Sequence, residues 1–328
     1  MKILFINSHA ADYVQDLTYS GLVKKLGVSN IIDVKWNKKF HINYKKYPKN
    51  LGHIQNSLIP SFFNRFSSKY DAVFVGASKV DCFEEYIKIA PSIHKNIPVI
   101  FIDGGDGYGI GSDLTVYGRP ELYEQSQKIR PFDYIFKREY IIGTKHPDNV
   151  FPLQISFRLD RLPELPTEKT YDVSFWAVET GGDLRTNVLK LLEDKFDCAE
   201  NGTKRNQKFS KYSRKGSFYL QELKRCNIVL NFRGGGWDTM RYWEVPAVGS
   251  LMVSQKPQIL IPNDFEDKKH VVHCKDDLSD LVEICQYYLD NPKEAEQIAK
   301  AGHEHLKEYH TDIKRAEYIL DKAKLTSI

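Results

Sequence analysis

The stretch from Asn231 to Ser250, NFRGGGWDTMRYWEVPAVGS, carries residue types that can bind an anion. Three glycines, Gly234, Gly235 and Gly236, follow the apolar run NIVLNF, which predicts a buried strand. Glycine lets an anion approach the backbone closely, and the N–H groups that begin a helix attract phosphate. The sequence therefore predicts a phosphate-binding turn, although a mobile surface turn would have the same composition.

A row of charged residues with a spacing of three follows the glycines: Asp238, Arg241 and Glu244. On a helix that begins near Trp237, this row drifts towards the apolar side, so we expect Glu244 to be half-buried. A buried carboxylate needs partners. It could accept hydrogen bonds from ribose or sugar hydroxyls, with Arg241 near a phosphate. Alternatively, Arg241 and Glu244 form only an ion pair along the helix.

A second polar turn, IDGGDGYGIGSD, follows the apolar run PVIF in the first half of the chain. Here Asp103 or Asp106 could orient an acceptor hydroxyl or act as a general base. The same DGG and DG sequences are also ordinary turn sequences. His9, after the first apolar run, is a further acceptor-side candidate that could face the donor, or simply a polar loop residue.

Apolar runs alternate with amphipathic stretches along the whole chain. Runs that are apolar on both faces and separated by helices predict parallel sheets covered on each side. The expected strands are residues 2–7, 31–36, 71–77, 98–103, 133–137, 171–178, 196–200, 227–232, 250–254 and 270–274. The expected helices are 12–26, 55–68, 83–94, 119–128, 184–195, 217–226, 237–246, 277–290, 293–309 and 312–325.

The segment 158–170, RLDRLPELPTEKT, has prolines and charges but no apolar periodicity, which is typical of a linker. We therefore predict an α/β protein with two Rossmann-like, doubly wound domains facing each other across a cleft. The first domain is residues 1–160 and the second is 161–311, with a terminal helix at 312–328 that packs back on the first.

Several of these segments together resemble a known family. ELKRCNIVLNFRGGGWDTMRYWEVPAVGSLMVSQ resembles the core motif of GT-B glycosyltransferases, most closely the subgroup named after a spore-maturation protein B. KTYDVSFWAVETGGDLRTNVLKLL resembles the first strand, loop and helix of their C-terminal domain, and the segment from residue 277 to 311 resembles their closing helices. The resemblance covers about residues 171–311 and implies a nucleotide-sugar-binding second domain.

The resemblance also implies roles for individual residues. Glu244 matches the carboxylate that holds the donor's ribose, and Arg241 and Arg185 match cations that reach the diphosphate. Related retaining enzymes carry a second glutamate eight residues earlier, where this chain has Gly236. That departure leaves the sugar contact and the stereochemistry open, with Asp238 as a candidate substitute.

The composition narrows the class further. Hydrophobic residues make up 41% and charged residues 27% of 328 residues, with a net charge of +4, as in a mildly basic globular protein. The cysteines are scattered and no signal peptide or membrane span is apparent, so we expect a cytoplasmic protein. No D-x-D triplet or zinc-ligand spacing occurs, so we expect neither a metal nor another cofactor, only a nucleotide-diphosphate sugar as donor substrate.

Two runs of basic residues lie at 36–49 and 204–215. They are either solvated loops or binding sites for a polyanion, which could be nucleic acid, a teichoic-type polymer or an anionic membrane. The sequence thus favours a metal-independent hexosyltransferase-like glycosyltransferase that uses a UDP-sugar or similar donor and an acceptor hydroxyl on a saccharide or other molecule. The alternatives are a phage-type glycosyltransferase of DNA bases, and a non-catalytic nucleotide-sugar-binding protein.

Overall fold

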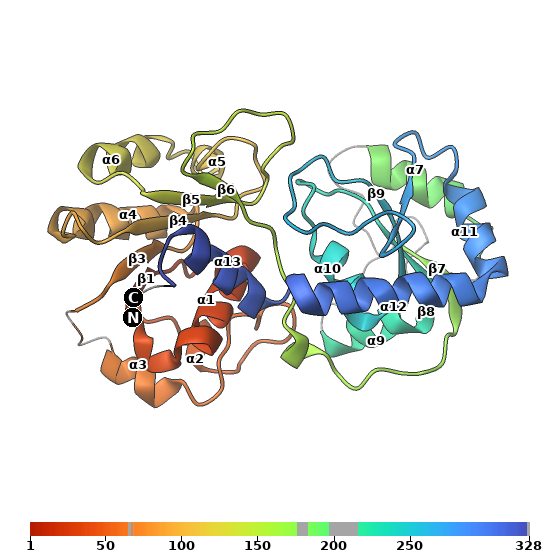
Figure 1. Ribbon diagram of the computed structural model, residues 1–328, viewed down its shortest axis with the longest axis horizontal. Helices are drawn as coiled ribbons and strands as arrows, with labels where there is room; N and C mark the ends of the chain where they lie inside the picture. The colour runs from red at the N-terminus through yellow and green to blue at the C-terminus, as the bar shows by residue number, and fades with distance from the viewer. Residues whose placement is uncertain (65–66, 68, 176–182, 197–215, 327–328) are drawn as a thin grey trace. The chain divides into compact units, whose positions relative to one another are not determined.

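The computed structural model describes residues 1–64, 67, 69–175, 183–196 and 216–326 (Figure 1). The chain forms two compact units. Unit 1 consists of Met1–Ser156, Ile259–Pro262 and Asp312–Ile328, and unit 2 of Phe157–Gln258 and Asn263–Thr311. Each unit contains its own parallel sheet, so the predicted α/β class is confirmed.

The sheet of unit 1 has the strand order β2-β1-β3-β4-β5-β6, and every neighbouring pair is parallel. Its strands are β1 (Ile3–Ile6), β2 (Ile31–Val34), β3 (Ala72–Val75), β4 (Val99–Asp103), β5 (Tyr134–Lys137) and β6 (Val150–Pro152). The central strands β3 and β4 are buried along their whole length, because apolar side chains on both faces are covered. The sequence missed β6, since three residues are too few to show a periodicity.

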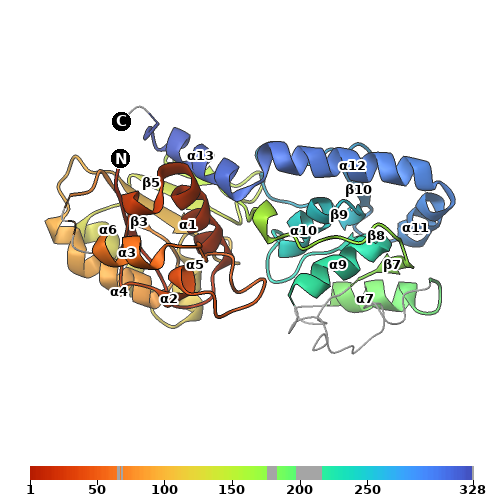
Figure 2. The same cartoon turned by 90° about the horizontal axis from the view of Figure 1, so that it is seen from below.

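Helices cover both faces of this sheet, and Figure 2 shows α1 and α13 on the side opposite to α4 and α6. The helices of unit 1 are α1 (Tyr13–Leu26), α2 (Lys38–His41), α3 (Leu58–Asn64), α4 (Val80–Ile89), α5 (Ser112–Val116), α6 (Glu121–Ile129) and α13 (Asp312–Lys322). Of these, α2 and α5 had no counterpart in the sequence prediction. Both are a single short turn or little more, which leaves no periodic pattern.

The last helix of the chain, α13, packs on α1 within unit 1. Gly21 makes this contact possible, because a Cβ there would lie 2.1 Å from the backbone oxygen of Asp312. Lys24 pairs with the buried Asp312 at 2.8 Å, and Lys25 pairs with Glu317 at 2.8 Å. Close backbone approach and two ion pairs therefore fix the terminal helix on α1.

Unit 2 has the strand order β10-β9-β8-β7, again entirely parallel. Its strands are β7 (Tyr171–Ser174), β8 (Cys226–Asn231), β9 (Leu251–Gln255) and β10 (Val272–Cys274). Its helices are α7 (Asp183–Leu192), α9 (Ser217–Arg225), α10 (Met240–Val248), α11 (Leu281–Asp290) and α12 (Pro292–Tyr309). Apolar side chains of α7, α11 and α12 pack against the strands to form one core.

Three sequence predictions in unit 2 extend beyond the described residues, and the first is the strand expected at 171–178, of which residues 176–178 lie outside them. Apart from Phe196, the strand expected at 196–200 lies outside them, and so does the basic run 204–215. No helix in the described part of the chain is long and apolar enough to cross a bilayer.

Candidate functional site

The glycine turn leaves the carboxyl end of β8, as predicted from the sequence. The Gly234 N–H donates to the Gly236 carbonyl at 3.0 Å and closes a tight turn, in which Gly235 is exposed. A Cβ at Gly234 would lie only 2.8 Å from Nη2 of Arg185. The turn therefore packs closely against the guanidinium of Arg185, which is not expected of a mobile surface turn.

The helix after this turn begins at Met240, so the prediction of a start near Trp237 is wrong by three residues. Thr239 is extended and its hydroxyl donates to Asn231 at 2.7 Å, while Asp238 accepts the indole N–H of Trp243 at 2.7 Å. These bonds hold the residues before Met240 against the end of β8. Asp238 is 1% exposed, and the geometry gives it a role in holding the turn.

Two arginines approach each other beside the turn. Arg185, on α7, donates to the backbone oxygens of Arg233 at 3.0 Å and Phe232 at 3.3 Å. Burial, together with the positive charge of Arg241, lowers the pKa of Arg185 to about 10. Two like charges held this close repel each other, so an anion bound beside them would be stabilised.

Arg241 lies in the first turn of α10, with its guanidinium 5.5 Å from the centre of the Phe175 ring. Its Nε atom is buried and has no hydrogen-bond partner among the described residues. A buried donor without an acceptor is costly. Arg185 and Arg241, which the sequence analysis assigned to one donor site, thus lie near each other, and their shared role in donor binding stays a prediction.

Glu244 is 3% exposed, so it is more deeply buried than the half-buried position predicted. The reason is Tyr219 of α9, which packs on α10 and whose hydroxyl donates to Oε2 of Glu244 at 3.1 Å. Burial and the carboxylate of Glu244 raise the pKa of Tyr219, while Arg241, which hydrogen-bonds the same hydroxyl, lowers it. The phenol therefore stays protonated and connects the carboxylate to the arginine pair.

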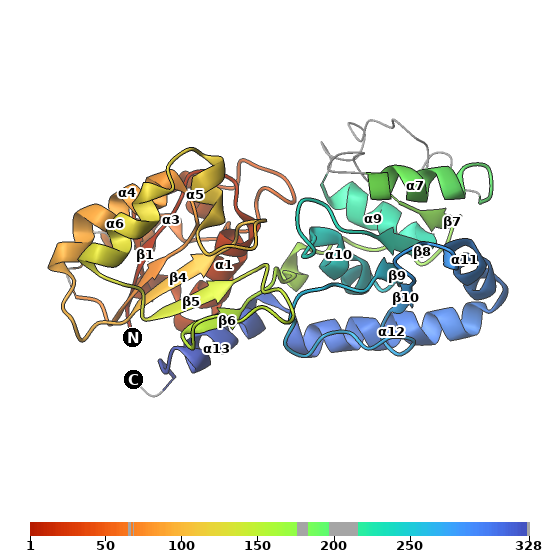
Figure 3. The ribbon, with the colours of Figure 1, turned by 90° about the horizontal axis from the view of Figure 1, so that it is seen from above.

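Tyr219 was not predicted from the sequence. It precedes Glu244 by 25 residues, and no local pattern joins the two. Only the packing of α9 against α10, side by side in Figure 3, brings them together.

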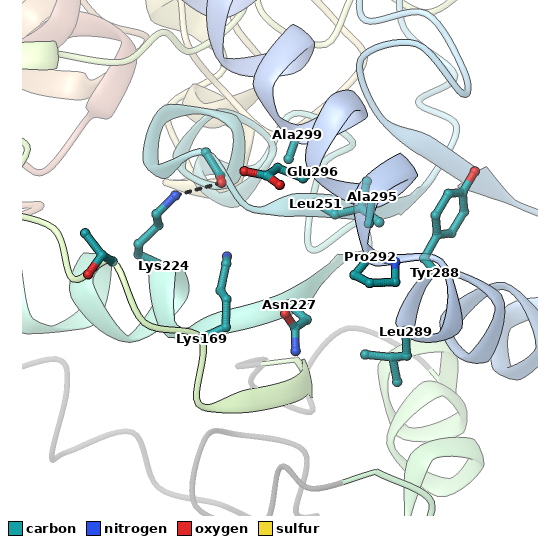
Figure 4. Close-up of a pocket in the computed structure, with 12 residues that line it drawn as sticks. Lys169, Lys224, Asn227, Leu251, Tyr288, Leu289, Pro292, Ala295, Glu296 and Ala299 are labelled. Atoms are coloured by element: carbon teal, nitrogen blue, oxygen red, sulfur yellow. Dashed lines mark hydrogen bonds between the residues drawn. The ribbon is translucent and has the colours of Figure 1, made fainter.

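A separate pocket of about 320 Å³ lies at the opposite, amino-terminal edge of the same sheet (Figure 4). Lys169 there donates to the Cys226 carbonyl at 2.8 Å and to Ser250 at 3.0 Å, and Lys224 donates to the Gly249 carbonyl at 3.0 Å. Both ammonium groups thus donate to backbone carbonyls near the first residues of β8 and β9. The pocket is remote from the glycine turn and does not belong to the same site.

In unit 1 the predicted acceptor-side residues lie at the carboxyl edge of the sheet. Asp103 is fully buried, pairs with Lys137 at 3.2 Å and accepts the Gly111 N–H at 3.0 Å, so it holds the following loop in place. Asp106 is exposed and pairs with Arg138 at 2.6 Å. His9 is also exposed, and its backbone N–H donates to Asp81 at 3.0 Å.

The same edge carries a carboxylate that the sequence analysis missed. Asp12 caps α1 by accepting the Gln15 N–H at 2.9 Å and is 8% exposed. Burial raises the pKa of Asp12 to about 6, although the Gln15 N–H and Lys79 act in the other direction. A carboxyl with such a pKa can hold or release a proton near neutral pH.

The chain is similar to known proteins in part of its sequence and in its fold. Residues 187–321 match the family described as glycosyl transferase-like. An alpha-glucosyltransferase in complex with UDP and a 13-mer DNA containing a central A:G mismatch is similar in structure, with a TM-score of 0.64, 11% identity and 98% of each chain covered. No curated protein sequence matches the chain significantly.

Two further solved structures are similar over nearly their full length. Anabaena HepE in complex with UDP-glucose has a TM-score of 0.63 at 10% identity, with 100% of each chain covered. The sucrose-phosphate synthase of Thermosynechococcus elongatus has a TM-score of 0.57 at 13% identity, with 99% of this chain and 98% of that chain covered. Likeness at such identities establishes the fold alone: the protein has the GT-B fold, and its residues 187–321 are similar to the glycosyl transferase-like family.

Proposed function

We propose that the protein transfers a sugar from a UDP-sugar to an acceptor hydroxyl. The observation that carries the proposal is the arginine pair, Arg185 and Arg241, held beside a glycine turn at the carboxyl end of β8. Parallel α/β sheets bind ligands at this edge. The family match over residues 187–321, and solved neighbours that hold UDP or UDP-glucose, support the same conclusion.

In this proposal the two guanidinium groups and the backbone N–H groups of the glycine turn bind the diphosphate. They stabilise the negative charge that develops on it as the bond between the sugar C1 and the diphosphate oxygen breaks. Glu244 accepts hydrogen bonds from the ribose hydroxyls, with Tyr219 fixing its orientation. The acceptor oxygen forms the new bond to C1 and gives up its proton.

A base must accept the proton that the acceptor hydroxyl gives up. We propose that a carboxylate at the carboxyl edge of the unit 1 sheet is this base. Asp106 is exposed there and pairs with Arg138, whereas burial raises the pKa of Asp12 to about 6, so that Asp12 can take a proton near neutral pH. Among the residues that the structure describes, no three His, Cys, Asp or Glu side chains gather as metal ligands. Several expectations from the sequence stay predictions. They are transfer without a metal or other cofactor, catalysis by Asp238, assignment to the hexosyltransferases and to the spore-maturation-protein-B-like subgroup, and a cytoplasmic location.

One alternative acceptor is DNA. The similar alpha-glucosyltransferase structures contain DNA, which favours this acceptor as the second candidate. Unlike saccharide binding, DNA binding is strongly salt-dependent, because each phosphate contact releases counterions. Binding of a DNA duplex that weakens steeply with added salt would therefore support the DNA acceptor.

The decisive experiment measures donor binding and donor turnover separately. Thermal shift with a panel of nucleotide sugars identifies the donor, because a ligand that binds only the folded state raises the melting temperature. UDP release is then followed with and without candidate acceptors. UDP release that depends on an acceptor supports the transferase. Binding of a nucleotide sugar without UDP release, whichever acceptor is added, supports a non-catalytic binding protein. If no nucleotide sugar binds, the proposal is contradicted.

A further inference from the structure

Helix α3 of unit 1 exposes its apolar side chains. Leu58, Ile59, Phe62 and Phe63 are 46%, 69%, 45% and 67% exposed. At about 100° per residue, these four positions fall within a sector of about 140°, so they form one face of the helix. Large apolar side chains gathered on one exposed face mark an interaction surface.

The opposite face of α3 carries polar residues and points into the protein. Ser61 is 2% exposed and its hydroxyl accepts the indole N–H of Trp36 at 3.0 Å. The Asn64 amide donates to the carbonyls of Val28 at 2.8 Å and Ile31 at 3.1 Å. The usual arrangement of a surface helix is therefore reversed. Specific hydrogen bonds hold the polar face inward, which keeps the apolar face in solvent.

The apolar surface continues onto the neighbouring loop. His41 hydrogen-bonds Ser57 at 2.8 Å, so the chain at Ile42 runs close to the start of α3. Ile42 is 43% exposed and Tyr44 is 46% exposed. We call the set of Ile42, Tyr44, Leu58, Ile59, Phe62 and Phe63 the α3 patch.

All the Lys, Arg, Asp and Glu residues in the chain segment that carries the α3 patch are basic, although Lys35 pairs with Glu85 and the buried Lys39 pairs with Asp16. Residues 34–70 contain no Asp or Glu, but they contain Lys or Arg at positions 35, 38, 39, 45, 46, 49, 65 and 69. Lys38 and Lys45 both lie 5.3 Å from the centre of the Tyr44 ring, and Lys46 and Lys49 are exposed. An apolar face bordered by cations is complementary to a bilayer surface with anionic headgroups.

We propose that unit 1 docks through the α3 patch onto an anionic lipid surface, with Leu58, Ile59, Phe62 and Phe63 inserted among the acyl chains and the lysines on the headgroups. Nucleic acid fits less well, because phosphate recognition needs cations and stacking needs aromatic rings, whereas Leu58 and Ile59 offer neither. This surface involves none of the residues assigned to donor binding, so the inference stands apart from the proposed function.

Flotation of the full chain with vesicles tests the proposal. We expect binding to vesicles of equal parts phosphatidylcholine and phosphatidylglycerol, and little binding to phosphatidylcholine alone. The double variant Ile59→Ser, Phe63→Ser should bind at least about tenfold more weakly, because two large apolar side chains no longer enter the bilayer. Lys45→Gln and Lys46→Gln should each weaken binding about fivefold.

A matched control replaces exposed apolar residues of unit 1 outside the patch. Val116 is 80% exposed and Ile142 is 57% exposed, and their replacement by Ser should leave vesicle binding unchanged. The proposal is overturned if the wild type does not bind anionic vesicles, or if the Ile59, Phe63 variant binds as tightly as the wild type. Binding of a DNA duplex but not of vesicles would assign the patch to nucleic acid. A dimer in light scattering that the double variant loses, without vesicle binding, would assign it to a second copy of the chain.

Discussion

Replacement of Glu244 by glutamine tests the proposed ribose contact most directly. Glu244→Gln keeps the shape of the side chain and one oxygen that can accept the Tyr219 hydroxyl, now 3.1 Å from Oε2. The change removes the negative charge that strengthens hydrogen bonds from ribose hydroxyls. Bonds to a charged group contribute about 1.5–3 kcal/mol, so UDP affinity should fall about ten- to a hundredfold.

Glu244→Gln should change the free energy of unfolding less than it changes the free energy of UDP binding. The bond from Tyr219 becomes a bond between neutral groups, a loss on the order of 1 kcal/mol, which lowers the melting temperature without ligand by a few degrees. Tyr219→Phe is the matched control, because it removes this bond, together with the bond to Arg241, and leaves the carboxylate in place. We expect a similar loss of stability but only a small loss of UDP affinity.

Calorimetric titration of UDP into the three proteins separates the two roles. If Glu244 only accepts the Tyr219 hydroxyl, both variants should lose stability and neither should lose affinity. Equal dissociation constants for the wild type and Glu244→Gln would therefore remove Glu244 from the donor site.

Three other expectations follow from the structure. Gly234→Ala places a Cβ 2.8 Å from Nη2 of Arg185, so UDP should bind more weakly. The same change at Gly109, where a Cβ meets nothing within 4 Å, should affect UDP binding little, and equal UDP affinity in all three proteins would contradict the fit of the turn. Sugar transfer should survive EDTA, and activity that is lost and then restored by manganese or magnesium would reveal a metal site. Burial raises the pKa of Asp12 from 3.8 to about 6, so the folded state keeps a proton that the unfolded chain releases, and the free energy of unfolding should fall as the pH rises through this window. Asp12→Asn can still cap α1 but cannot titrate. In urea denaturation, the free energy of unfolding of this variant should therefore rise relative to that of the wild type by up to about 3 kcal/mol between about pH 4 and pH 6. A difference in the free energy of unfolding that does not vary with pH would refute the pKa shift.

The sequence by itself determined most of the strands and the position of the glycine turn. Apolar runs such as those of β3 and β4 are local, because a strand buried on both faces needs apolar residues at every position. The turn after β8 is local too, since consecutive glycines stand directly behind an apolar run. Helical spacing likewise placed Glu244 on the inner side of α10, although it underestimated the burial.

Only the tertiary structure decided what those side chains contact. Tyr219 bonds Glu244, and the charge of Arg241 acts on Arg185, because residues of separate helices come together near one end of β8. Thr239, which precedes the first residue of α10, is held by its hydrogen bond to Asn231 at the end of β8. The pKa of Asp12 likewise reflects burial by distant residues. Spacing along the chain fixes which residues share a face, whereas the partner of each face is set by packing between segments far apart in sequence, and that packing decides burial, charge and hydrogen bonding at the site.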